Sequence, residues 1–366
     1  MRTLDRQQLS DILYGCAIMG TGGGGELTEG FDYIDKALAA GKTFKLVSID
    51  ELEDDKLLCT PYMLGALALE QDQIYDALPQ AGRPSIMVAY QRLTEYFGKD
   101  IDGTVCCELG GSNTAISFYL AAMIDGVIID ADPAGRAVPE ITHSTYYLND
   151  LPAAPIITAN EFGECFVLEN IKDDQRAEHV VRALSMISRN DIAAIDHVLP
   201  VSELKHALIK GTISKALAIG EAYRRAKAEG KDIAQAVAEF GGGQVQFRGK
   251  VSSFVFKTQD GFTLGTVDIE GQGSDQGNHY RLNVKNENLS SELNGKIDVT
   301  IPELICCFDM DSLQPVTNPH FSEGMNVAIV VLPAPSEFTT PRGLKAFGPQ
   351  YLGLNTPYRP VVKGRQ

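Results

Sequence analysis

The sequence predicts an α/β N-terminal domain with a parallel or mixed sheet, followed by a β-rich α+β C-terminal domain. Two observations lead to this fold class. Helical and strand-like patterns alternate up to about residue 165, whereas short alternating apolar runs bounded by Gly, Asn and Asp follow the GGGQ segment at 241–244. A chain of 366 residues also exceeds what one hydrophobic core usually organises. We therefore expect an α/β domain over 1–168 and, over 169–366, helices followed by a β-sandwich or barrel-like domain.

The first domain begins with a predicted helix, LDRQQLSDILYGCAIM, that leads into a run of glycines. The helical segments FDYIDKALAAGK and SIMVAYQRLTEYFGK then alternate with the strand-like TFKLVSI and LLCTPYML. The next segments, GTVCCEL, GGSNTAISFYLAAMIDG and VIIDAD, have the order of a parallel βαβ unit. Because such a crossover is right-handed, both strands should end at one edge of the sheet, where ligands bind in open α/β sheets. Glu108, Asp130 and Asp132 are expected to project there together.

The second domain begins with two predicted helices, DDQRAEHVVRALSMISR and the long SELKHALIKGTISKALAIGEAYRRAKAEG, which has an apolar face. Strand-like runs follow the GGGQ segment: VQFRGKVSSFVFK, FTLGTVDIEG, HYRLNVKNE, KIDVTIPELICCFD and MNVAIVVLPAP. These short runs predict the sandwich or barrel, with the helices packed against it.

The segment Met19–Glu26, MGTGGGGE, formally satisfies the dinucleotide-binding fingerprint through Gly20, Gly22 and Gly25. That fingerprint requires a strand before the glycines, but a helix precedes them here. The phosphate-binding Gly-Lys-Ser/Thr motif is absent as well. Four consecutive glycines are more than a turn after a helix needs, so they indicate a loop whose backbone approaches a ligand. The expected substrate-binding residues of this loop are Gly22, Gly23, Gly24 and Gly25.

The densest group of functional residue types lies between residues 104 and 145. Its predicted helix begins with backbone N–H groups and a positive dipole end that suit a carbonyl or an oxyanion. Taken singly, the residues downstream indicate an Asp N-cap, an Arg136–Glu140 salt bridge and a surface His143. Five ionisable groups within fourteen residues favour a site, because burying several charges without a function is costly. The candidate binding residues are Gly110, Gly111, Ser112 and Asn113, and the candidate catalytic residues are Glu108, Asp130, Asp132, Arg136, Glu140 and His143.

The sequence identifies no certain cofactor and leaves a divalent metal open. Asp130, Asp132, Glu140 and His143 are weak candidate ligands, because the chain lacks His-Glu-x-x-His and any thiolate pair with zinc spacing. Nucleophilic catalysis by Cys106 or Cys107 is less expected than packing in the core, and no Gly-x-Ser-x-Gly motif is present. The remaining histidines are scattered and expected to be surface or structural residues: His179, His197, His206, His279 and His320.

Composition limits the classes of partner and compartment. A net charge of −16 argues against a nucleic-acid or anionic-membrane partner, which would require basic residues. We expect no signal peptide, because no apolar stretch follows the first basic residue, and no run of about eighteen apolar residues exists to span a bilayer. Seven cysteines without Cys-x-x-Cys spacing indicate a reducing compartment, so a cytoplasmic protein is expected.

Six segments, in this order along the chain, carry a resemblance to a known family: GTGGGG, ELGGSNTA, DADPAGRAVPE, NENL, PELICCFD and GLKAFGPQYLG. Together they resemble the S-methyl thiohydantoin desulfurase family, which is associated with hydantoinase and oxoprolinase proteins. The resemblance implies a two-domain hydrolase that removes methanethiol from a five-membered S-methyl thiohydantoin ring and leaves the hydantoin. The matching positions are Gly22 to Gly25, Glu108, Gly110, Gly111, Asn113, Asp130, Asp132, Gly135, Arg136, Pro139 and Glu140. The chain departs from the family pattern at Pro133-Ala134 and at ITHSTYY after Pro-Glu, positions expected to line the ring pocket.

Hydrolysis at an amidine-like carbon requires a base, a stabiliser of the tetrahedral intermediate and an acid for the leaving thiol. We expect Glu108 or Asp132 as the base and Asn113 with the Gly110 to Ser112 amides as stabilisers. Arg136 or His143 is the expected partner of the ring carbonyl, with Glu140 orienting Arg136.

Two other functions remain open at this stage. One is a non-catalytic accessory or ligand-binding subunit of a hydantoinase/oxoprolinase-like system, and the other is a metal-dependent cyclic amidohydrolase. The expected partners are therefore a small-molecule substrate and either a second copy of the chain or a hydantoinase-like protein.

Overall fold

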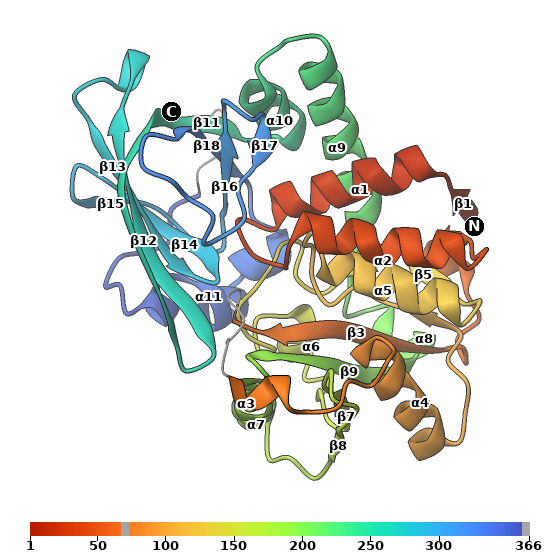
Figure 1. Ribbon diagram of the computed structural model, residues 1–366. Helices are drawn as coiled ribbons and strands as arrows, with labels where there is room; N and C mark the ends of the chain where they lie inside the picture. The colour runs from red at the N-terminus through yellow and green to blue at the C-terminus, as the bar shows by residue number, and fades with distance from the viewer. Residues whose placement is uncertain (67–72, 361–366) are drawn as a thin grey trace.

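The computed structural model describes residues 1–66 and 73–360 and contains two eight-stranded sheets (Figure 1). The first sheet is mixed and carries helices on both faces, while the second is antiparallel. In Figure 1 the second sheet lies to the left of the first. The predicted fold class is therefore confirmed.

The first sheet has four parallel strands at its centre and antiparallel strands on either side. In spatial order its strands are β1 (Arg2–Leu4), β2 (Phe44–Val47), β5 (Val127–Ile129), β4 (Gly103–Thr104), β3 (Leu57–Gly65), β9 (Asp191–Pro200), β7 (Ile156–Ala159) and β8 (Cys165–Leu168). The parallel pairs join β2, β5, β4 and β3. The predicted βαβ unit is present, because β4 and β5 pair in parallel around α5 (Asn113–Met123).

Helices cover both faces of this sheet. One face packs against α1 (Arg6–Met19), α2 (Leu27–Ala39), α4 (Ser85–Phe97), α5 and α9 (Thr212–Ala228). The other face packs against α6 (Thr145–Leu148), α7 (Asp174–Met186) and α8 (Val201–Leu204). Strand β9 shows why both faces are covered, since Ala193 and Ile195 belong to the first core and Ile192 and Ala194 to the second.

Two local predictions were wrong. The run GTVCCEL is strand only at Gly103–Thr104, so Glu108 lies in a loop beyond β4. The predicted long helix beginning at SELKH is divided into α8, β10 (Ile209–Lys210) and α9, because β10 pairs with β6 (Ala131–Asp132).

The second sheet is a single sheet of antiparallel strands around its own core. Its spatial order is β15 (Lys296–Thr300), β14 (Glu287–Leu293), β13 (His279–Lys285), β12 (Phe262–Gly271), β11 (Gln244–Gln259), β18 (Asn326–Leu332), β16 (Leu304–Asp309) and β17 (Gln314–Pro315). Residues from β11, β12, β13, β15, β16 and β18 share one apolar cluster, so the sheet curves around a common interior. The division at residue 168 stays a prediction; β9, which lies beyond it, belongs to the first sheet.

Short elements complete the described chain. They are α3 (Gln73–Asp76), α10 (Ile233–Gly241) and α11 (Pro341–Phe347), with single 3₁₀ turns η1 (Ile49–Glu51), η2 (Gly273–Asp275), η3 (Ser336–Thr339) and η4 (Pro349–Leu352). Within residues 1–66 and 73–360, no helix combines the length and apolar character that crossing a membrane requires.

Candidate functional site

A cavity of about 390 Å³ lies between the first sheet and the start of β14 in the second sheet. This volume is in the range of small-molecule sites. Six of the sequence-predicted site residues line it: Gly24, Gly25, Glu108, Ser112, Asn113 and Glu140. Eight others lie outside its lining: Gly22, Gly23, Gly110, Gly111, Asp130, Asp132, Arg136 and His143.

The backbone of the glycine run lies directly against the backbone of the segment that begins α5. The Gly24 carbonyl accepts hydrogen bonds from the backbone N–H groups of Ser112 and Asn113, at 3.0 and 3.1 Å. A Cβ on Gly24 would lie 2.4 Å from the Cα of Gly110, so the two loops are in backbone contact. The α5 amides of Ser112 and Asn113, predicted to be free for an oxyanion, are therefore occupied by the loop.

The same glycine run contacts the second sheet. A Cβ on Gly23 would lie 1.9 Å from Oε1 of Glu287, the first residue of β14. The backbone N–H of Asn288 donates to the Thr21 carbonyl at 2.8 Å, and that of Asn318 donates to Gly22 at 2.9 Å. The loop thus joins α1, α5 and the second sheet, while Gly24 and Gly25 also line the cavity.

Glu108 is a buried carboxyl group held at the cavity wall, with 6% of its surface exposed. Its Oε1 accepts from Nδ2 of Asn113 at 2.7 Å, and its Oε2 accepts from the Val138 backbone N–H at 2.7 Å. The Asn113 amide also exchanges hydrogen bonds with both backbone groups of Met63, which fixes its orientation. Burial raises the pKa of Glu108 to about 7, so this carboxyl group exchanges protons near neutral pH.

Asp130 and Asp132 do not join Glu108 in the cavity, contrary to prediction. Oδ2 of Asp132 accepts from the Ala134 and Gly135 backbone N–H groups at 2.9 and 2.8 Å, and burial raises its pKa to about 6. Asp130 accepts from the backbone and hydroxyl of Ser214, at 2.8 and 2.5 Å. Asp132 therefore organises its own turn beside the β6–β10 pair, and Asp130 binds the start of α9. The Asp132 carboxylate is still close enough to raise the pKa of Glu108.

Arg136 is buried, and its predicted salt bridge with Glu140 does not form. Its guanidinium donates to the Glu303 carbonyl at 2.7 Å and to the Thr21 hydroxyl at 2.7 Å, which joins the two sheets. Glu140 instead pairs with Lys285 and accepts from the Tyr351 hydroxyl at 2.5 Å.

His143 is buried, although the residue taken singly was predicted to be at the surface. It packs against the rings of Phe347 and Tyr351, each with a centroid separation of 4.5 Å. Burial lowers the pKa of His143 to about 3, so the imidazole is neutral at pH 7. His143 is not among the residues that line the cavity, and its expected contact with a ring carbonyl stays a prediction.

Strand β9 brings a polar pair to the cavity that the sequence reasoning missed. Nδ1 of His197 lies 2.7 Å from Oδ1 of Asp196, and the Tyr62 hydroxyl donates to Oδ2 of Asp196 at 2.9 Å. The ring of Tyr146 stacks on His197 with a centroid separation of 4.0 Å, and its hydroxyl lies 3.0 Å from that of Thr60. A signal existed in the sequence, because Asp and His are adjacent within the apolar run DIAAIDHVLP.

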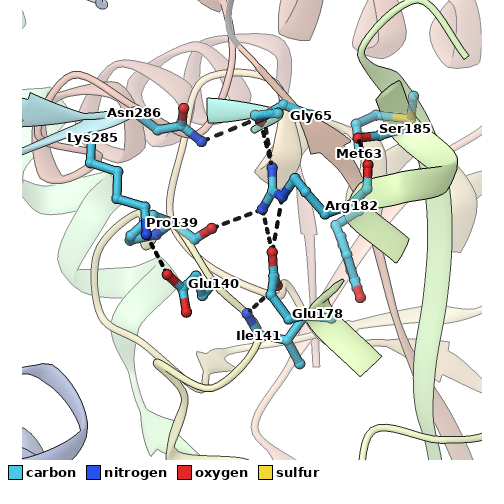
Figure 2. Close-up of polar contacts among 12 residues, drawn as sticks. Met63, Gly65, Pro139, Glu140, Ile141, Glu178, Arg182, Ser185, Lys285 and Asn286 are labelled. Carbon is cyan, nitrogen blue, oxygen red and sulfur yellow. Dashed lines mark hydrogen bonds and ion pairs between the residues drawn. The ribbon is translucent and has the colours of Figure 1, made fainter. Parts of the chain in front are cut away.

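Arg182 and Glu178 form a buried ion pair beside the cavity (Figure 2). Nη2 of Arg182 donates to Oε1 of Glu178 at 2.6 Å and to the Pro139 carbonyl at 2.9 Å. Its Nη1 donates to the carbonyls of Gly65 and Gly261, both at 3.1 Å. Figure 2 shows Arg182 between Gly65, Pro139 and Glu178. With its bond to Gly261, this one side chain joins α7, β3, the β11–β12 turn and the loop before Glu140.

Glu287, in the NENL segment at the start of β14, is a further carboxyl group in the cavity lining, and it was given no role from sequence. Only 2% of its surface is exposed, and its Oε2 has no hydrogen-bond partner within the described chain. Burial, and then the charge of Glu108, raise the pKa of Glu287 well above its ordinary range. Glu287 therefore holds its proton more strongly than an ordinary glutamate does.

Two protein-family models match the chain, one over each half. The model of the S-Me-THD-like N-terminal domain matches residues 7–170, and that of the S-Me-THD-like C-terminal domain matches residues 172–361. The chain belongs to the S-Me-THD-like family.

A crystal structure of a Chromobacterium violaceum protein resembles this S-Me-THD-like chain with a TM-score of 0.77. The match covers 99% of this chain and 100% of that one at 22% identity, so it shows a shared fold. A comparison with curated proteins gave no match.

The four weak metal candidates of this S-Me-THD-like protein are not assembled into a ligand set. Asp130 binds Ser214, Asp132 binds its own turn, Glu140 pairs with Lys285 and His143 lies between aromatic rings. Across residues 1–66 and 73–360, no group of three or more His, Cys, Asp or Glu side chains is arranged to hold a metal ion. What the cavity does offer is proton transfer, by carboxyl groups whose pKa values burial raises.

Proposed function

We propose that this protein is a hydrolase that removes methanethiol from an S-methyl thiohydantoin ring bound in the cavity between the two sheets. Membership of the S-Me-THD-like family supports the substrate class. The observation that carries the proposal is Glu108, a buried carboxyl group at the cavity wall with a pKa of about 7. A general base is most effective when its pKa lies near the working pH.

The reaction begins with attack of water on the ring carbon that carries the methylthio group. Glu108 accepts one water proton as the carbon–oxygen bond forms, and the electrons of the ring C=N bond move to nitrogen. The C–S bond then breaks, methanethiol leaves, and the ring carbon becomes a carbonyl. Overall, one water hydrogen ends on the ring nitrogen and the other on sulfur.

Asp196 and His197 support this reaction by forming one wall of the cavity. Burial alone would lower the pKa of His197, but the Asp196 carboxylate raises it above its ordinary value. Both imidazole nitrogens have protein partners, Asp196 at 2.7 Å and the Leu151 carbonyl at 3.3 Å. We therefore assign this pair to shaping the cavity, with Glu108 as the base.

The test is release of methanethiol from an S-methyl thiohydantoin by the purified chain, followed with a thiol reagent. We expect Glu108→Gln to lower kcat/KM by about 10²–10⁴-fold, the usual contribution of a positioned base. Glu292→Gln is the matched control, because Glu292 is half-buried on β14 outside the cavity lining and should keep full activity.

Three results would contradict the proposal. No release by the wild-type chain would favour an accessory or binding subunit. Full activity of Glu108→Gln would remove this residue from the mechanism. Loss of activity with a chelator, restored by a divalent ion, would favour the metal-dependent amidohydrolase.

A further inference from the structure

We propose that Glu287, from the second sheet, is the general acid that protonates the departing sulfur. This inference rests on the proposed function and deepens it, because it supplies the proton donor that the reaction needs. It also gives the second domain a direct part in the chemistry.

The first argument is the position of Glu287. It begins β14, lines the cavity with Glu108 and is almost completely buried. Oε1 contacts the backbone of Gly23, where a Cβ would lie only 1.9 Å away, while Oε2 has no hydrogen-bond partner in the described residues. A buried polar atom without a partner is rare and costly, so we infer that its partner is the ligand.

The second argument is the contrast between the two carboxyl groups. Two carboxylates that share a buried site cannot both ionise easily, so their pKa values separate. Glu108 is stabilised in its ionised form by two hydrogen bonds, at 2.7 Å each, whereas Oε2 of Glu287 has none. The charge of Glu108 raises the pKa of Glu287 further. Of these two carboxyl groups, Glu108 is therefore the better placed to accept a proton and Glu287 the better placed to donate one.

The protons balance over a complete turnover. Glu108 takes a proton from the attacking water, and Glu287 gives its proton to sulfur as the C–S bond breaks. The ring is left as a hydroxyl next to a C=N bond. The hydroxyl proton then passes to Glu287 and the proton on Glu108 passes to the ring nitrogen. The products are hydantoin and methanethiol, and both carboxyl groups return to their starting states.

The experiment compares two leaving groups. An alkyl thiolate is basic and needs a proton to leave, whereas a trifluoroethyl thiolate is a much weaker base. We expect Glu287→Gln to lower kcat by about 10²–10⁴-fold on the S-methyl ring. On the S-trifluoroethyl ring the loss should stay below about tenfold, because little proton transfer is needed. Glu292→Gln, on the same strand, should behave as wild type on both.

A second variant tests the same role without changing the carboxyl group. Gly23→Ala forces Glu287 to move, because the new Cβ and Oε1 cannot lie 1.9 Å apart. It should show the same dependence on the leaving group as Glu287→Gln.

The outcomes separate the two proposals. Suppose that the wild type releases methanethiol but Glu287→Gln loses activity equally on both rings, or loses none. The role of Glu287 is then overturned, and the hydrolase proposal stands. No release by the wild type overturns both.

Discussion

The contact between Gly24 and Gly110 predicts a large effect from adding one methyl group. Gly24 has a φ of +74° and its Cβ would lie 2.4 Å from the Cα of Gly110. Alanine in the left-handed region costs about 1–2 kcal/mol, and overpacking against immobile backbone adds about 1–3 kcal/mol. We therefore expect Gly24→Ala to lower the free energy of unfolding by about 2–5 kcal/mol.

Gly242→Ala is a matched control for backbone strain alone. Gly242 has a φ of +75° but has no atoms within 4 Å of its Cβ position. It should lose only about 1–2 kcal/mol. Urea unfolding followed by far-UV circular dichroism measures both variants, since the chain has no tryptophan for fluorescence. Equal destabilisation of the two variants would show that the Gly24–Gly110 contact adds nothing to the cost of placing alanine at a positive φ.

Three further predictions concern pH and the buried ion pair. The pKa of His143 is about 3 when folded, so the unfolded chain binds more protons between about 6.5 and 3 and stability falls as the pH drops through this range. Replacing His143 by Leu should remove about 2 kcal/mol of the loss of stability between pH 7 and pH 5, measured by urea unfolding. Because Glu108 must be ionised to act as the base, kcat/KM for methanethiol release should rise with pH up to about 7, and Glu108→Gln should lack this rise. Arg182→Leu leaves Glu178 unpaired and should cost about 3–5 kcal/mol in urea unfolding, part of which Glu178→Leu in the same chain should restore.

The sequence was sufficient to predict the parts of the fold that depend on residues close together in the chain. The helix before the glycines, α5 and the parallel pairing of β4 with β5 follow from local periodicity and turn residues. Glu108 and Asn113 are only five residues apart around a helix start, so their shared position at the cavity could also be predicted.

The rest depends on contacts between distant segments. Glu287 meets the glycine loop through the packing of β14 against residues more than 250 positions earlier, which no spacing rule describes. Arg136 finds its partners across the interface, so its nearness in sequence to Glu140 was misleading. His143 was placed at the surface because its burial depends on α11 and η4, about 200 residues later.

Strand β9 has a consequence for how the chain is made. It lies between β3 and β7, yet residues 191–200 follow both of these strands in the sequence. A chain emerging from the ribosome has completed β3 and β7 while the position between them is still empty, and nine residues of β3 present an unpaired edge. The first sheet can close only after β9 has been synthesised. During that interval the growing chain is exposed to edge-to-edge association with its neighbours on the same messenger RNA.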